Sequence, residues 1–211
     1  MNAATKALTE QLADPKSAKR RSAAKKIRTS GNPEAGPILL AALQKELGDQ
    51  RTWETQYQMI MALGHCLHFK ANDFLEALSH EGRIESVQSA IGDTLFRLSD
   101  GLEGDMGKVE EFIERNDPEL IQGAFQAMAV QRIVPVSENS ARRIVDYGCS
   151  LKLGENDWAV IWLLRAVPGW PSHLIEPLLT HWGRVDFREQ QQIHTAVQFA
   201  RETKYCKWSP L

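Results

Sequence analysis

The stretch KRRSAAKKIRTSGNPEAGPILLAAL, residues 19–43, decides the fold. Its first part places apolar residues at helical spacing among basic ones, and its last part carries a denser apolar pattern of the same period. Between the two, Gly31-Asn32-Pro33 ends the first helix, because glycine tolerates a left-handed cap and proline cannot continue a helix. The stretch therefore predicts two consecutive helices joined by a tight turn.

Variants of this helix pair recur along the chain. The apolar residues that align when the first helices are superimposed are Ile27, Leu63, Leu95, Met128 and Leu164, at spacings of 36, 32, 33 and 36 residues. A period of this length is typical of helix-pair arrays. No stretch alternates for long between apolar and polar residues, so strands are not expected. We predict an all-α fold in a single domain over 1–211. The expected pairs are 15–47, 52–81, 85–116, 118–151 and 156–183, with a capping helix over 187–203.

The composition is that of an ordinary globular protein. The net charge of −2 does not call for nucleic acid or an anionic membrane as a partner. The three cysteines are far apart and form no paired motif, which is typical of a reducing compartment. Residues 1–11 have no apolar core of signal-peptide type, and no segment approaches the roughly 20 apolar residues that cross a bilayer. We expect a cytoplasmic protein that does not contact a membrane.

The first unit has recognisable motifs at 20–27, 31–35 and 37–43: an Arg- and Ala-rich helix, then Gly-Asn-Pro-Glu-Ala, then a Pro-led Leu- and Ala-rich helix. The second unit keeps Ala-Leu-Gly at 62–64 and Phe-Leu-Glu-Ala-Leu at 74–78. These motifs resemble the short HEAT-like repeat of bacterial proteins. The resemblance implies a right-handed α-α superhelix whose second helices line a concave face. Most relatives bind proteins, and a minority bind nucleic acid or act as lyases or DNA glycosylases.

Charge is unevenly distributed along the chain. Residues 1–51 carry ten Lys and Arg against five Asp and Glu, whereas 70–119 carry five against thirteen. Within the acidic region, the candidate partner-binding residues are Glu103, Asp105, Glu110, Glu111 and Glu114. Such a surface can steer a basic protein toward docking, although it can equally be a solvated face. The loop lacks the carboxylate spacing of a calcium site.

Tryptophan is concentrated in the last third of the chain. Trp158 and Trp162 are four residues apart, so one helix face can carry both. Tryptophan together with arginine is typical of interface hot spots, although a core role is the usual one for tryptophan. The further partner-binding candidates are Arg143, Trp162, Arg165 and Trp182.

Other chemistries have weaker support in the sequence. The basic run over 16–28 can contact phosphate, but its cations spread around the helix and no aromatic residue lies among them to stack bases. His65 and His68 supply only two of the four ligands that zinc usually takes. Asp157-Trp158 is superficially similar to the pair with which HEAT-like DNA glycosylases cradle a cationic base.

We find no nucleophile–base pair and no Gly-rich phosphate loop, and therefore expect no catalytic residue, no metal and no cofactor. The hypothesis is a non-enzymatic protein-binding scaffold that holds a basic protein on a concave, acidic surface. Its specific form would be a bacterial adaptor or an immunity or antitoxin-type inhibitor. The alternatives are a DNA-binding glycosylase or other nucleic-acid module, for which the sequence is unfavourable, and a lyase-type chaperone for a prosthetic group. The oligomeric state is left open.

Overall fold

The described chain is helical throughout. The computed structural model describes residues 3–186 and 190–205. Within these ranges the chain forms twelve α-helices, with short 3-10 turns at four of the connections, and no strand. The predicted all-α class is confirmed. No helix in the described ranges is long and apolar enough to cross a bilayer.

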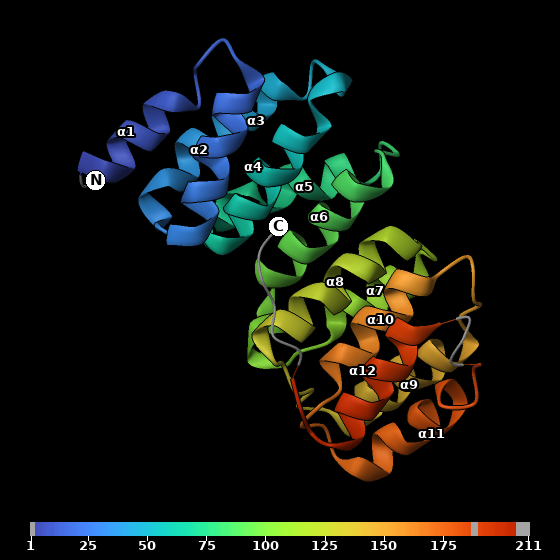
Figure 1. The fold of residues 1–211 in the computed structure, drawn as a ribbon. Helices are drawn as coiled ribbons and strands as arrows, with labels where there is room; N and C mark the ends of the chain where they lie inside the picture. The colour runs from blue at the N-terminus through green and yellow to red at the C-terminus, as the bar shows by residue number, and fades with distance from the viewer. Residues whose placement is uncertain (1–2, 187–189, 206–211) are drawn as a thin grey trace. The chain divides into compact units, whose positions relative to one another are not determined.

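The first of two compact units spans Met1–Leu98. Its helices are α1 (Ala3–Gln11), α2 (Ser17–Ser30), α3 (Gly36–Glu46), α4 (Trp53–His65), α5 (Asn72–Ser79) and α6 (Glu85–Arg97). Helix α4 packs against both α2 and α6, so these three helices form a row (Figure 1). Helix α3 packs on α4, α5 packs on α6, and α1 lies against α2.

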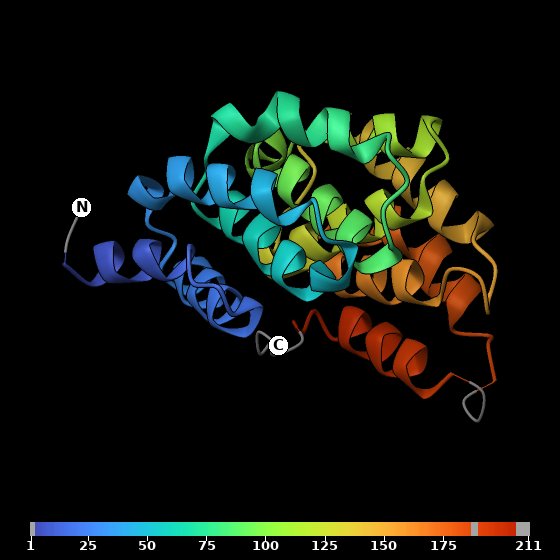
Figure 2. The same ribbon diagram turned by 90° about the horizontal axis from the view of Figure 1, so that it is seen from above.

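The second unit spans Ser99–Leu211. Its helices are α7 (Gly107–Glu114), α8 (Pro118–Gln131), α9 (Glu138–Ser150), α10 (Asp157–Ala166), α11 (Ser172–Trp182) and α12 (Gln191–Arg201). Helices α8, α10 and α12 pack in one row, and α7, α9 and α11 in another. Figure 2 shows α12, drawn in red, beside the orange helices of the same unit.

Each predicted pair contains two observed helices, and the predicted cap corresponds to α12. Residues 187–189, at the start of the predicted cap, lie outside the described ranges. The division between the two units falls after α6, inside the third predicted pair. The five residues that align across the first helices are all fully buried, as expected for the core positions of a repeated pair.

The predicted turn at 31–33 connects α2 to α3. Gly31 has φ of 59°, the left-handed region that glycine adopts without a steric penalty, and its N–H donates to the carbonyl of Ile27. The Asn32 side chain then accepts a hydrogen bond from the Glu34 N–H and caps a short 3-10 turn that leads into α3. The second helix of the pair thus starts immediately after the first ends.

Two buried tryptophans of the helix pair over 156–183 are hydrogen-bonded to the preceding pair over 118–151. In each case the indole N–H donates to a backbone carbonyl more than 30 residues earlier in the chain. The bonds are Trp170 Nε1 to Ile133 O at 2.9 Å and Trp182 Nε1 to Gly148 O at 3.0 Å. Because a buried carbonyl without a donor is costly, these bonds contribute to the packing register of the unit.

Gly148 permits a close helix approach on α9. A Cβ atom at this position would lie 2.3 Å from Leu163 Cδ2 of α10 and 2.9 Å from Leu178 Cδ1 of α11. Real carbon–carbon contacts do not reach these distances. Glycine is therefore required for the observed packing of α9 against its neighbours.

Two enclosed ion pairs lie in the first unit. Arg20 of α2 donates from two guanidinium nitrogens to the carboxylate of Glu46 on α3, at 2.6 and 2.7 Å. Arg97 and Asp93 pair within α6, and both side chains are almost completely buried. A buried ion pair stabilises the fold little more than apolar side chains of similar volume would. Removing one of the two charged side chains is nevertheless destabilising, because the other charge is left buried and uncompensated.

Candidate functional site

The loop that precedes α7 is held against the chain that follows α8. Gly104 has φ of 92°, and a Cβ atom there would lie 2.6 Å from the carbonyl oxygen of Val134. The Gly104 carbonyl accepts a hydrogen bond from the Val136 N–H at 3.0 Å. Two predicted binding residues lie in this loop. Asp105 accepts a hydrogen bond from the Gly107 N–H at 2.7 Å and so orders the start of α7. Glu103 is exposed.

The three glutamates of α7 are paired with basic residues of the same chain. Arg143 of α9 contacts Glu110 at 2.5 Å and Glu114 at 3.1 Å. Glu111 lies 2.7 Å from Lys108 and 3.8 Å from Arg115. Arg143, itself a predicted binding residue, therefore acts within the fold as a counter-ion. This surface carries less uncompensated negative charge than the sequence suggested, which weakens the argument for a basic partner here.

The tryptophans divide between core and surface. Trp182 is 2% exposed and Trp170 is 4% exposed. Trp182 therefore belongs to the core that joins α11 to α9 and is not available for contact with a partner. Trp208 lies outside the described residues. Trp162 is partly exposed, and Trp158, which was not among the selected candidates, is 52% exposed.

Trp158, Trp162 and Arg165 form a stripe on α10. Their spacing of four and three residues places them on one helix face. The Arg165 guanidinium lies over the Trp162 ring, 5.0 Å from its centroid, as a cation–π contact. Large, partly exposed aromatic rings beside arginine are the side chains that dominate binding energy at protein interfaces.

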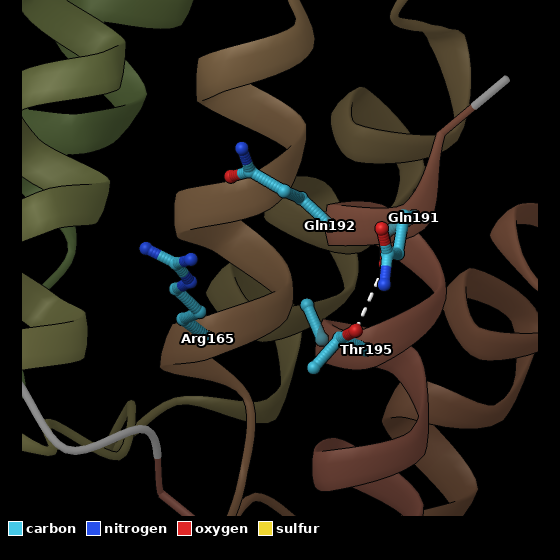
Figure 3. Close-up of a pocket in the computed structure, with 5 residues that line it drawn as sticks. Arg165, Gln191, Gln192 and Thr195 are labelled. Atoms are coloured by element: carbon cyan, nitrogen blue, oxygen red, sulfur yellow. Dashed lines mark hydrogen bonds between the residues drawn. The ribbon is translucent and has the colours of Figure 1, made fainter.

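A pocket of about 220 Å³ adjoins this stripe (Figure 3). Arg165 lines it from α10, and Gln191, Gln192 and Thr195 line it from the first turns of α12. In Figure 3 the Gln192 side chain extends from α12 toward the side of α10 that carries Arg165. Sequence reasoning selected Arg165 but missed the α12 residues, whose only signal was the glutamine-rich start of the capping helix.

Asp157 joins the two helices that form the pocket. Its Oδ1 accepts from the Gly154 N–H at 2.8 Å, and its Oδ2 accepts from the side-chain amide of Gln190 at 3.0 Å. Both carboxylate oxygens are thus engaged in positioning the start of α10 against the residue before α12. This structural role weakens the comparison of Asp157-Trp158 with the cation-cradling pair of DNA glycosylases.

Several cations of the basic run are also paired within the chain. Lys19 contacts Asp14 at 3.0 Å, Arg20 is held by Glu46, and Arg21 pairs with Glu54. Arg28, at the end of the run, is buried. These contacts remove much of the charge that a phosphate track would use.

The histidine pair does not form a metal cluster. His65 is half-buried, and burial, reinforced by the charges of Arg97 and Arg28, lowers its pKa to about 4. His68 instead packs against the start of α3, where a Cβ atom on Gly36 would overlap its ring. In the described residues there is no group of three or more His, Cys, Asp or Glu side chains arranged to hold a metal ion.

Comparison with known proteins adds little to this geometry. No family model matches the chain, and no curated protein matches it. Among solved structures, the crystal structure of an engineered protein from the Northeast Structural Genomics Consortium is similar at a TM-score of 0.40 and 17% sequence identity. The match covers 99% of this chain and 100% of that one. A likeness at that TM-score supports no conclusion on fold family or function.

Proposed function

We propose that this protein is a non-enzymatic, HEAT-like protein-binding scaffold in which each unit is a short segment of right-handed α-α superhelix. Two features support the superhelix: alternate helices pack side by side within each unit, and the opening pair carries the HEAT-like motif. Arrays of this kind present long surfaces for holding other macromolecules. A protein partner agrees with the near-zero net charge and with the internal pairing of the basic run.

The observation that carries this proposal is the α10 stripe. Trp158 exposes about half of its surface, and Arg165 is stacked on Trp162 rather than engaged with a carboxylate of the described chain. Aromatic and arginine side chains are enriched at interface centres, where Lys and Glu are depleted. We therefore place the contact surface on α10 and α12 rather than on the internally paired glutamates of α7.

The test is affinity purification from the native cell with three baits: wild type, Trp158→Ala and Trp53→Ala. Trp53 is the matched control because it is 39% exposed and lies in the first unit. The partner should be captured by wild type and Trp53→Ala and lost with Trp158→Ala. With purified partner, Trp158→Ala should weaken binding by about 10- to 100-fold, the effect of losing an interface hot spot.

Two results would contradict the proposal. The first is equal partner binding by wild type, Trp158→Ala and Arg165→Ala, all with unchanged circular dichroism spectra. The second is binding to duplex DNA with the steep salt dependence that comes from phosphate neutralisation. That second result would favour the nucleic-acid alternative.

A further inference from the structure

Arg165, which lines the pocket between α10 and α12, has a polar atom with no hydrogen-bond partner among the described residues. The Nε of Arg165 is buried and makes no hydrogen bond in the described structure. No acidic side chain among the described residues forms an ion pair with this guanidinium. Because this donor is unsatisfied and no carboxylate neutralises the side chain, the Arg165 guanidinium keeps hydrogen-bonding capacity for an acceptor that enters the pocket.

The surroundings of Arg165 hold its guanidinium in a fixed place. The Trp162 ring supports it at 5.0 Å, and such stacking restricts the side chain without satisfying its N–H donors. The Asp157–Gln190 hydrogen bond ties the beginning of α12 to the beginning of α10. The pocket is therefore organised before any ligand arrives, which reduces the entropic cost of binding.

We infer that this pocket receives one acidic side chain, aspartate or glutamate, of a protein partner. The carboxylate would accept from the Arg165 guanidinium and from the side-chain amide of Gln192, which extends toward the same side of α10. Apolar side chains that flank the acidic residue would pack on Trp158 and Trp162. This inference rests on the proposed protein-binding function and specifies the chemistry of its contact.

The lining favours a single negative charge. Among the described residues, Arg165 is the one cationic side chain that lines this pocket, and the other polar side chains are two amides and a hydroxyl. The Thr195 hydroxyl already donates to the Gln191 carbonyl at 2.9 Å. A phosphate dianion is usually held by several cationic or backbone donors, whereas one guanidinium matches a carboxylate in both charge and fork geometry.

The first experiment is a nuclear magnetic resonance titration of the full chain, which follows the Arg165 Nε–Hε and Trp162 indole signals. The probes are N-acetyl-glutamate-N-methylamide, its neutral glutamine analogue, and inorganic phosphate, all at matched ionic strength. The glutamate probe should shift both signals with a dissociation constant on the order of tens of millimolar, as one charge-assisted bidentate pair supports. Equal shifts with the glutamine analogue, no shift with glutamate, or tighter binding of phosphate would each overturn the inference.

The source of the carboxylate is tested with a peptide probe. Acetyl-Leu-Glu-Leu-amide should bind at least about 3-fold tighter than the single-residue probe, because its leucines reach the tryptophan stripe. No gain in affinity would indicate a site for a free carboxylate and would overturn the assignment to a protein side chain.

Matched variants locate the site. Arg165→Gln should abolish the Trp162 shift, Arg165→Lys should weaken it, and Arg142→Gln, at an exposed arginine of α9, should leave it unchanged. An unchanged shift in Arg165→Gln would overturn the inference. Loss of the partner with Trp158→Ala but no response to the glutamate probe would refute this inference and leave the protein-binding function intact.

Discussion

Acidification should destabilise the first unit through His65. This residue ends α4, and its Nε2 is buried without a hydrogen-bond partner among the described residues. Burial and the positive charges of Arg97 and Arg28 disfavour its protonation, whereas Asp93 favours it. The net result is a pKa of about 4 in the folded chain, against an ordinary value of 6.5.

The sign and size follow from proton linkage. The unfolded chain binds a proton at His65 below about pH 6.5, and the folded chain does not bind one until about pH 4. The contribution of neutral His65 to the free energy of unfolding is therefore fully present above pH 6.5. It is lost progressively as the pH falls from 6.5 to about 4. At pH 5 the difference between the two pKa values lowers the free energy of unfolding by about 2 kcal/mol. Solvent at the exposed edge of the ring screens part of this, so we expect a loss of about 1–2 kcal/mol.

The assay is urea unfolding followed by far-ultraviolet circular dichroism near pH 8 and near pH 5, for wild type and His65→Gln. The variant should lose about 1–2 kcal/mol less on acidification than wild type, whatever its stability at the higher pH. His68→Gln is the matched control: burial also lowers the pKa of His68, but less of that ring is enclosed. Equal acid sensitivity of wild type and His65→Gln would refute the reasoning.

Three further predictions concern stability and are measured by urea unfolding near pH 8. Gly148→Ala should destabilise by about 1–3 kcal/mol, because the new methyl group overlaps Leu163; an unchanged midpoint would contradict the close approach. Glu46→Ala should lower the free energy of unfolding by about 2–3 kcal/mol, because it leaves the mostly enclosed Arg20 guanidinium without its counter-ion. A loss below about 0.5 kcal/mol would show that the pair behaves as a solvent-exposed one. Trp182→Phe should lower the free energy of unfolding by about 1–2 kcal/mol, because the indole donor to the Gly148 carbonyl is lost. The near-ultraviolet circular dichroism spectrum should change as well.

The paired helices were predictable because their information is local. Each pair carries an apolar period, a turn residue and a second apolar period, and these signals do not depend on distant parts of the chain. Helix α1 was missed for an equally local reason. The residues of α1 that are buried are Thr5 and Thr9, so its inner face is polar and leaves no hydrophobic stripe in the sequence.

The candidate site was predicted less well because its features depend on tertiary contacts. Glu110 and Arg143 are 33 residues apart, and nothing near either residue in sequence shows that each neutralises the other. Likewise, Trp158 and Trp182 both lie in apolar helical patterns, yet one is half-exposed and the other enclosed. The pocket requires the packing of α12 on α10, which spacing along the chain does not specify.

The uneven placement of indoles gives the protein an intrinsic optical reporter. Trp170 and Trp182 are enclosed in the second unit, whereas Trp53, the tryptophan of the first unit, is partly in contact with solvent. Fluorescence emission from enclosed rings shifts to longer wavelength when they meet water, so the largest spectral change should follow the second unit. Circular dichroism, by contrast, weights the helices of both units. Unfolding curves from the two methods will coincide if the units melt together and separate if they melt in turn.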